Sequence, residues 1–382
     1  MKWERKTINE VCNVGDGAHA SIKRTTEGFQ YLTSKNFKLD GLDLNKVDFI
    51  SEVDYFKHFR DDSKAITKPK SNDVLLSIIG SLGAPYLVKE EDVFGLSSSV
   101  SILRPKNEII EPRFLFYWIK SNEFQSSINN IKSGVAQSFL SLGMIKSLPV
   151  IYPKELPTQR KIASILSAYD DLIENNLKRI KLLEEKAFAS YKLIVQNEKL
   201  EEFTIEELAN VVMGQSPTSD TYTNEKEDNL PFHQGVTNFS NYFVEHKIYC
   251  KAPIKIAEEG DILFSVRAPV GRINFTSDKI CIGRGLCAFR SKKGFQNYFY
   301  HQLKEFFFAE DVIGNGAIFN AVTKVELMKV KLKTPSEKIQ QEFEIEAQQM
   351  FNLILNLTKQ NNKLREARDI LLPKLMSGQI EV

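Results

Sequence analysis

The chain repeats itself, and this internal repeat limits the folds open to it more than any other feature of the sequence. Residues 7–14, TINEVCNV, return as residues 204–211, TIEELANV, and Gly17 matches Gly214 at the same offset of 197. Self-similarity on this scale is the signature of a duplicated structural unit. We therefore expect two copies of one module in tandem.

Two further matches follow in the same order. Residues 73–77, DVLLS, and Gly83 return as residues 261–265, DILFS, and Gly271 at an offset of 188. The offset falls along the chain, which indicates shorter loops in the second copy and a retained skeleton of strands and turns. The third match, at an offset of 182, pairs Gly134, Lys146, Leu148, Val150, Pro153 and Gln159 with Gly316, Met328, Val330, Leu332, Pro335 and Gln341.

Each copy has a globular part and a helical part. Residues 1–153 and 200–335 alternate short apolar runs with Gly, Pro, Ser and Asn turns, as in β-rich α+β domains, and each holds one aromatic-rich helix, at 113–124 and 297–308. Residues 154–199 and 336–382 carry apolar side chains at steps of three and four, which predicts two long amphipathic helices.

The two long helices should pack on each other, because an amphipathic helix needs its apolar face buried. One helix leaves the first globular domain and the other leaves the second, so the predicted pairing is antiparallel, with the two copies related by a pseudo-two-fold axis. Asn175, Asn176 and Asn361 fall in or beside the seam. Polar seam residues can fix helix register, and a solvated edge is the equal alternative.

Composition limits the class of protein. With 382 residues the chain can bury two cores, and its net charge of +2 argues against a protein that grips nucleic acid by bulk electrostatics alone. The charged N-terminus and the lack of any apolar run of about 20 residues predict a cytoplasmic protein with no membrane segment. Four cysteines without a C-x-x-C pair predict no metal site.

The motifs of several enzyme classes are missing. The sequence holds no phosphate-binding G-x-x-x-x-G-K-[ST] loop, no Asn-Pro-Pro or Asp-Pro-Pro element of amino-methyltransferases, and no G-x-S-x-G. Single acids such as Asp73 and Asp261 are interpreted as turn or capping residues. We therefore predict a chain that binds and does not catalyse.

Two segments carry a family resemblance. LIENNLKRIKLLE at 172–184 and RDILLPKLMSGQI at 368–380, with a β-rich domain before each helix, resemble the specificity subunits of type I restriction-modification enzymes over essentially the whole chain. One departure stands out: Gln137 fits the family's pattern after the conserved Gly, whereas the second copy has Phe319.

The resemblance implies two target recognition domains, each reading one half of a bipartite site in double-stranded DNA, with the helices as a spacer. It also implies partners: two methyltransferase subunits docked on the helices, including segments 160–195 and 338–375, and restriction subunits in the full complex. S-adenosylmethionine, ATP and magnesium are then expected in those partners and no cofactor in this chain.

Bases are read by side chains that reach their edges, and loops on a rigid sheet hold such side chains. Exposed turn residues with hydrogen-bond donors are the candidates. In the first domain these are Lys23, Arg24, Thr33, Ser34, Lys35, Asn36, Ser81 and Ser138. In the second they are Gln215, Ser216, Thr218, His233, Gln234, Thr237, Asn238, Arg267, Arg272, Arg284 and Asn320.

The three arginines stand out, because the guanidinium fork matches a guanine edge. The alternatives are surface charges paired with a carboxylate for the arginines, turn caps for the Ser, Thr and Asn residues, and a core histidine for His233.

Different loops on a shared skeleton predict different half-sites and an asymmetric target. Two other hypotheses stay open: an enzyme with its own transferase or nuclease centre, and a coiled-coil scaffold whose globular ends bind proteins.

Overall fold

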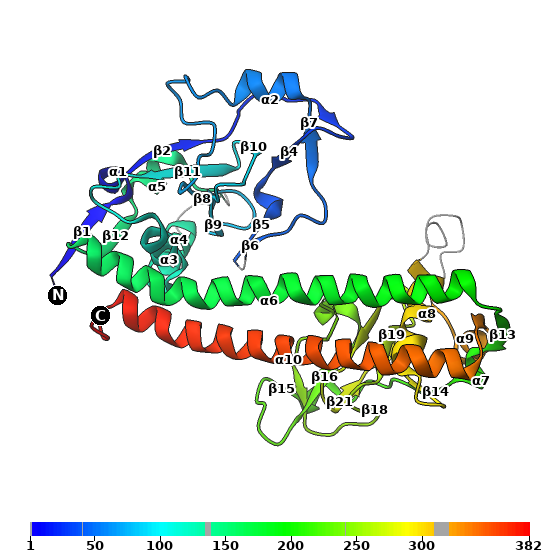
Figure 1. The fold of residues 1–382 in the computed structure, drawn as a ribbon. Coiled ribbons are helices and arrows are strands. Elements are labelled where there is room, and N and C mark those ends of the chain that lie inside the picture. Colours follow the sequence, from blue (N-terminus) through cyan, green and yellow to red (C-terminus); the bar gives the residue numbers. More distant parts are fainter. Residues whose placement is uncertain (1, 40, 134–138, 241, 309–320) are drawn as a thin grey trace. The chain divides into compact units, whose positions relative to one another are not determined.

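The computed structural model describes all residues except 1, 40, 134–138, 241 and 309–320. The chain divides into two compact units, drawn in Figure 1. The first unit comprises residues 1–174 and 361–382, and the second comprises residues 175–360. The predicted helices are present as α6 (Leu156–Asn197) and α10 (Glu337–Met376), and each unit takes one globular segment and part of each helix.

The first unit is a mixed α and β structure. Its helices are α1 (Ile8–Val11), α2 (Glu52–His58), α3 (Pro112–Lys120), α4 (Asn122–Ser133), α5 (Leu142–Ser147) and the 3₁₀ turn η1 (Ser34–Asn36). Its strands are β1 (Trp3–Thr7), β2 (Cys12–Asp16), β3 (Arg24–Thr25), β4 (Phe29–Leu32), β5 (Phe37–Lys38), β6 (Gly41–Leu42), β7 (Asp48–Ile50), β8 (Val74–Ser77), β9 (Pro85–Leu87), β10 (Phe94–Leu96), β11 (Val100–Pro105) and β12 (Pro149–Pro153).

The second unit repeats this plan in a shorter segment. Its helices are α7 (Ile205–Leu208), α8 (Gln296–Phe308), α9 (Lys324–Met328) and the 3₁₀ turns η2 (Ser219–Thr221) and η3 (Val236–Asn238). Its strands are β13 (Glu201–Thr204), β14 (Ala209–Met213), β15 (Tyr222–Thr223), β16 (Leu230–His233), β17 (Tyr249–Cys250), β18 (Ile256–Ala257), β19 (Ile262–Ser265), β20 (Ile273–Phe275), β21 (Ile280–Ile282), β22 (Leu286–Ser291) and β23 (Lys331–Thr334).

Sheet topology confirms the repeat. The first unit has a four-stranded sheet in the order β2-β11-β8-β9 and a pair β1-β12, and the second has β14-β22-β19-β20 and β13-β23. These are the same connections at corresponding places in the chain. The larger remaining sheets differ: β10-β4-β7-β3 has four strands and β15-β17-β16-β21-β18 has five.

Local chemistry explains why the matched segments fold alike. Thr7 and Thr204 are the N-caps of α1 and α7, and each forms a capping box with the glutamate three residues on. This box satisfies backbone donors at a helix start. Gly83 and Gly271 have φ of +81° and +88°, a backbone region that favours glycine. The sequence matches therefore mark caps and turns.

One aromatic-rich helix differs from its prediction. The segment 113–124 forms two helices, because Ser121 ends α3 with extended backbone (φ −66°, ψ 152°) and its Oγ accepts from Phe124 N at 3.3 Å at the start of α4. The segment 297–308 is a single helix, α8. α3 packs on β8 and β9, and its buried Phe114 and Trp118 belong to the main core of the first unit.

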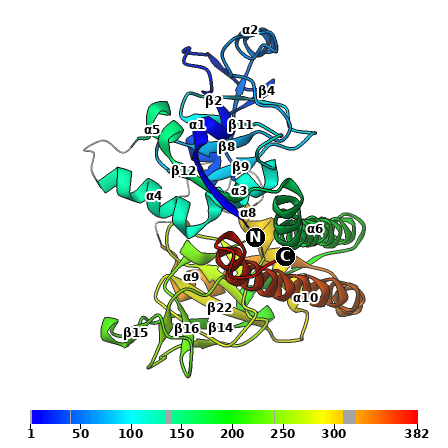
Figure 2. The same cartoon turned by 90° about the vertical axis from the view of Figure 1, so that its left-hand side faces the viewer.

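Within each unit the parts of α6 and α10 lie side by side and run antiparallel (Figures 1 and 2). In the second unit, Lys186 pairs with Glu346 at 3.1 Å and the ring of Tyr191 contacts that of Phe343. In the first unit, Arg368 is buried and pairs with Asp170 at 2.5 Å.

The seam asparagines divide between the two alternatives. Asn176 and Asn361 are buried, at 7% and 1% exposure, whereas Asn175 is exposed. The third repeat match needs one correction: the side chain of Gln159 donates to Pro153 O at 2.8 Å, and the residue that does the same to Pro335 O, at 3.0 Å, is Gln340 and not Gln341. The helix start is therefore shifted by one residue between the copies.

Three expected absences can be examined over the described ranges. Among them, no helix is both long and apolar enough for a membrane span. The same residues contain no cluster of three or more His, Cys, Asp or Glu suited to a metal ion. All four cysteines are free thiols in buried positions.

Candidate nucleic-acid interface

Two arginines lie beside the last hydrogen bond between β19 and the chain before β22. These strands are antiparallel neighbours, and beyond their last paired residues Val266 N donates to Gly285 O at 3.0 Å. Arg267 follows Val266 and Arg284 precedes Gly285, so the two arginines flank this bond, and the residue bridged to Arg267 is Ala321. Both side chains are exposed. The strand ends therefore present two guanidinium groups at one edge of the sheet.

Close backbone contacts hold Arg284 in place. It lies between two glycines, and a Cβ on Gly285 would stand 2.4 Å from Gln234 O. A Cβ on Gly214 would stand 2.1 Å from Gly283 O. Side chains at these glycines would collide with backbone, so the loops can approach this closely only with glycine there.

A hydrogen-bonded pair lies beside Arg284. Ser216 Oγ donates to Gln234 Oε1 at 2.7 Å and accepts from Arg284 N at 3.2 Å. Gln234 is exposed, and its amide N–H groups can donate to a ligand. We call Gln215, Ser216, Gln234, Arg267 and Arg284 the second crest.

The charge of the second crest is not neutralised within the unit. Among the described residues, no carboxylate forms an ion pair with Arg267 or Arg284. Two like charges held near each other repel. An arrangement of this kind suits an anionic ligand, whose charge would compensate the two cations.

The first unit builds the same backbone ladder. Gly17 N donates to Val100 O at 3.1 Å, as Gly214 N donates to Leu286 O at 2.9 Å. A Cβ on Gly17 would stand 2.3 Å from Leu96 O, so this approach also requires glycine. The loops of both units therefore leave the sheet along the same path.

The side chains on that path differ. Ile78 N donates to Ser99 O at 3.0 Å, which is the counterpart of the bond between Val266 and Gly285, and Ile79 and Ser98 are the residues that flank it. Ile79 is 46% exposed. By the same correspondence we call Ala18, His19, Thr33, Ile79 and Ser98 the first crest. It has no arginine.

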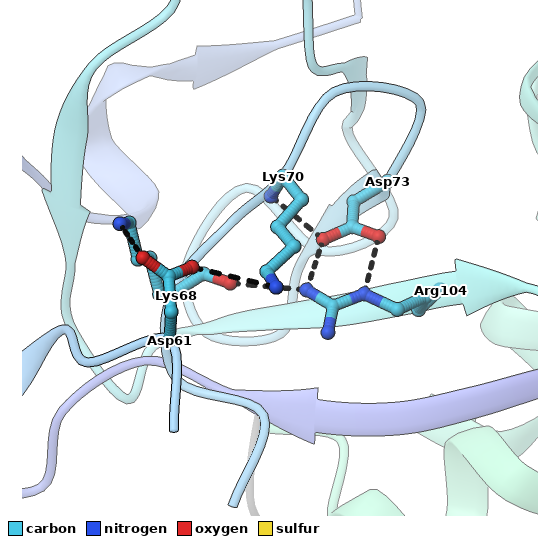
Figure 3. A network of polar contacts seen from close by, with 5 residues as sticks. All are labelled: Asp61, Lys68, Lys70, Asp73 and Arg104. Atoms are coloured by element: carbon cyan, nitrogen blue, oxygen red, sulfur yellow. Dashed lines mark hydrogen bonds and ion pairs between the residues drawn. The ribbon is translucent and has the colours of Figure 1, made fainter. Parts of the chain in front are cut away.

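Acids at the other end of these strands have a structural role. Asp73 accepts from Lys70 N at 2.8 Å and from Arg104 Nε and Nη2 at 2.9 and 2.8 Å, while Lys68 and Lys70 pair with Asp61 (Figure 3). The predicted turn role is confirmed, and the two-pronged ion pair joins β8 to β11.

The second unit has the same device. Asp261 accepts from Glu258 N at 2.9 Å and from Arg290 Nε and Nη2 at 2.7 and 2.9 Å. This pair joins β19 to β22, the two strands that end at the second crest. Both acids therefore hold strands together and are not candidates for catalysis.

A family model agrees with this duplicated architecture. The model described as type I restriction modification DNA specificity domain matches residues 1–185 and again residues 197–366. The chain belongs to the type I restriction-modification DNA specificity family. Its two units are the two specificity domains, one per match.

Relatives of this specificity-family chain span its whole length. It is 28% identical over 407 aligned residues to the putative type I restriction enzyme MjaX specificity subunit of Methanocaldococcus jannaschii, covering 100% of this chain and 94% of the relative. It is 32% identical over 165 residues to the EcoBI specificity subunit of Escherichia coli, covering 39% and 34%. A solved S subunit from M. genitalium shares the fold with a TM-score of 0.60 at 16% identity, covering 98% and 96%.

The structure of the specificity domains brings five predicted residues of the second unit together, namely those of the second crest. Others lie elsewhere. Arg272 lines a cavity of about 380 Å³ together with Tyr300 and Lys304. Thr218 caps η2, and Thr237 and Asn238 lie in η3.

His233 was also predicted as a binding residue, and the structure buries it to 1% exposure. Its Nε2 lies 2.9 Å from His246 Nδ1, and burial lowers the pKa of His233 to about 3, so the ring is neutral near pH 7. His233 is therefore a core histidine, which was the alternative to a binding role.

In the first unit the expectation of exposure is wrong for two residues. Ser34 and Asn36 are buried, at 8% and 5% exposure. Asn36 Nδ2 donates to Asp43 O and Lys46 O at 3.1 and 3.0 Å, and its Oδ1 accepts from Thr33 N at 3.0 Å. Asn36 is therefore a cap that closes a loop on itself.

The remaining first-unit candidates are scattered. Arg24 is paired with Asp48 at 2.9 Å and stacked over the ring of Tyr31 at 4.0 Å, which is the surface-pair alternative. Lys23, Lys35 and Ser81 are exposed. The predictions for Ser138 and Asn320, and the departure at Gln137 and Phe319, fall outside the described residues.

Turn composition does not predict Ile79 and Ser98 as binding residues. The repeat itself contains the signal for one of them: the offset of 188 that matches Asp73 to Asp261 also matches Ile79 to Arg267. Ile79 does not meet the criterion of an exposed donor, because an aliphatic side chain has no hydrogen-bond donor.

Proposed function

We propose that this chain is the DNA-reading subunit of a type I restriction-modification enzyme, and that it binds an asymmetric bipartite target with one half-site per unit. The observation that carries the proposal is the pair of crests: one backbone ladder occurs twice and presents different side chains each time. Two copies of one backbone that present different side chains suit a target whose two halves have different sequences.

In this proposal the chain catalyses nothing itself and works in the cytoplasm. It docks two methyltransferase subunits and, through them, restriction subunits, and S-adenosylmethionine, ATP and magnesium act in those partners. Support for docking comes from exposed apolar side chains on the long helices. Leu182 and Leu193 on α6 are 64% and 61% exposed, and Ile345 and Ile370 on α10 are 61% and 59% exposed. Such apolar surface suits a protein partner.

The decisive experiment expresses the chain with the methyltransferase subunits of its own system and maps methylated adenines in the host DNA. We expect a stable complex and one asymmetric, two-part motif with an unread gap. A complex that forms without any sequence-dependent methylation would support a protein-binding scaffold instead. Turnover by the isolated chain with S-adenosylmethionine or magnesium, abolished by one substitution, would show an enzyme.

A second experiment tests the helices as a spacer. α6 and α10 each continue, by their bounds, from residues of one unit into residues of the other. Deleting one helical turn from α6 should change the length of the tolerated gap and leave both half-sites as they were. A changed half-site sequence would refute the spacer role.

A further inference from the structure

The two arginines of the second crest can only donate, because a guanidinium group has no acceptor. Gln234 belongs to the same crest, and its Oε1 accepts from Ser216 Oγ at 2.7 Å. Its amide N–H groups can donate to a ligand as well. Three neighbouring side chains thus present hydrogen-bond donors from one loop cluster.

Three other exposed arginines of the chain have an acid as partner. Arg290 pairs with Asp261 at 2.7 Å, Arg24 with Asp48 at 2.9 Å, and Arg60 with Asp62 at 2.5 Å. Within the described residues, the two crest arginines form no ion pair of this kind. Two guanidinium groups at this place in the fold are therefore available to bind a ligand.

We infer that the half-site bound by the second unit contains guanine, and that Arg284 and Arg267 read it through the major-groove edge of the base. This inference rests on the proposed function. Guanine is the base that presents two acceptors, N7 and O6, and no donor at that edge, which matches the two donor-only guanidinium groups. Cytosine and adenine edges each carry an amino group, which a donor cannot contact favourably.

The rigid backbone favours a base contact over a phosphate contact. A phosphate can be held by flexible lysines or arginines, because the contact sets position and does not depend on sequence. Arg284 instead lies between glycines that admit no side chain, and its own N–H is bonded to Ser216 Oγ. A guanidinium group that must donate to two acceptors of one planar base is helped by a backbone whose position is fixed.

The first unit provides the matched control. Where the second crest has Arg267 and Arg284, the first has Ile79 and Ser98, so the corresponding position of its half-site has no guanidinium to read it. Substitutions at Ile79 should therefore act on the other half-site only. This difference separates base reading from a general loss of DNA affinity.

The test uses the full chain assembled with its methyltransferase subunits. After the methylated motif is mapped, the complex is titrated with duplexes that carry each single base-pair change, at two salt concentrations. Variants are Arg284→Lys, Arg267→Lys and, as the control, Ile79→Ala. Lysine keeps the charge and loses the fork, so non-specific affinity should hold.

We expect guanine in one half-site, and a loss of at least about tenfold in discrimination at a guanine position for each lysine variant. The other half-site should be unaffected. Ile79→Ala should alter that other half-site alone. Near-wild-type binding to non-specific DNA shows that the lysine variants are folded.

Three results would overturn the inference. The half-site assigned to the second unit could contain no guanine. The lysine variants could leave discrimination unchanged while Arg284→Ala lowers affinity for all duplexes and reduces the salt slope by about one, which is the behaviour of a phosphate contact. A wild-type complex with no defined motif would instead refute the proposed function, and this inference with it.

Discussion

The two units share a backbone and differ in the side chains that it presents. The first crest carries Ile79 and Ser98 at the strand ends where the second carries Arg267 and Arg284, although the bonds that position them correspond, at 3.0 Å in each unit. Strand ladders, caps and buried ion pairs are needed for folding in both copies. The crest side chains contribute little to folding, so they can diverge while the frame stays the same.

The largest expected effect tests whether the two units share the same close backbone contacts. Gly17→Ala and Gly214→Ala should each lower the free energy of unfolding of their own unit by about 3 kcal/mol or more, because the new Cβ would lie 2.3 and 2.1 Å from carbonyl oxygens. Urea denaturation followed by hydrogen exchange measures this for each unit. Gly235→Ala is the control, since nothing lies within 4 Å of a Cβ there. Equal effects from all three variants would break the comparison.

The ion pairs that join the strands should differ in strength. Asp73→Asn should cost about 3 kcal/mol and Asp261→Asn about half of that. Both acids are buried, but Arg104 is 28% exposed and Arg290 is 53% exposed, so solvent screens the second pair more. Equilibrium urea denaturation of the two variants gives the order. A larger loss for Asp261→Asn would contradict the role of screening.

Acid should weaken the second unit more than the first. Burial lowers the pKa of His233 and of His301 to about 3, below the value of about 6.5 in an unfolded chain. The unfolded state then binds protons first, so this stability is complete above about pH 6.5 and declines as the pH falls toward 3. In the first unit the described histidines, His19 and His58, are not buried.

Glu184 acts in the opposite direction, because burial raises its pKa to about 7, so its contribution to stability is present at low pH and is lost as the pH rises from about 4.5 to 7. Burial also raises the pKa of Glu344, which acts in the same direction as Glu184. The two buried histidines should outweigh both carboxyl groups, and we expect a net loss on the order of 1 kcal/mol between pH 6.5 and 5. Hydrogen exchange at both pH values resolves the units. His301→Gln should reduce the loss, and an equal acid sensitivity in both units would contradict this account.

The smallest expected change in stability sharpens the comparison at the crests. Exchanging the second crest for the first, as Arg267→Ile with Arg284→Ser, should leave the free energy of unfolding within about 0.5 kcal/mol of wild type, and on the stable side, because it removes two neighbouring like charges at exposed positions. The reverse exchange, Ile79→Arg with Ser98→Arg, should cost a similar amount. Thermal unfolding measures both. A clear destabilisation by the first exchange would show that the arginines serve the fold.

Much of the architecture could be predicted because it depends on neighbours in sequence. The apolar rhythm of 154–199 predicted α6 to within two residues, and the repeat predicted two copies of one module, which appear as the sheets β2-β11-β8-β9 and β14-β22-β19-β20. The exposure of the loops could not be predicted in this way. Asn36 has the composition of an exposed turn, yet it is buried because Asp43 O and Lys46 O, seven and ten residues away, accept from its amide.

The sequence by itself determined the duplication, the caps, the turns and the long helices, since each follows from interactions within a few residues. Only the tertiary structure decided which side chains share a crest. Arg267 and Arg284 come near each other because β19 pairs with β22, and Ile79 occupies the matching place because β8 pairs with β11. Strand register results from many weak contacts between segments that are distant in the sequence. The residues next to an arginine or an isoleucine therefore do not reveal which strand it will pair with.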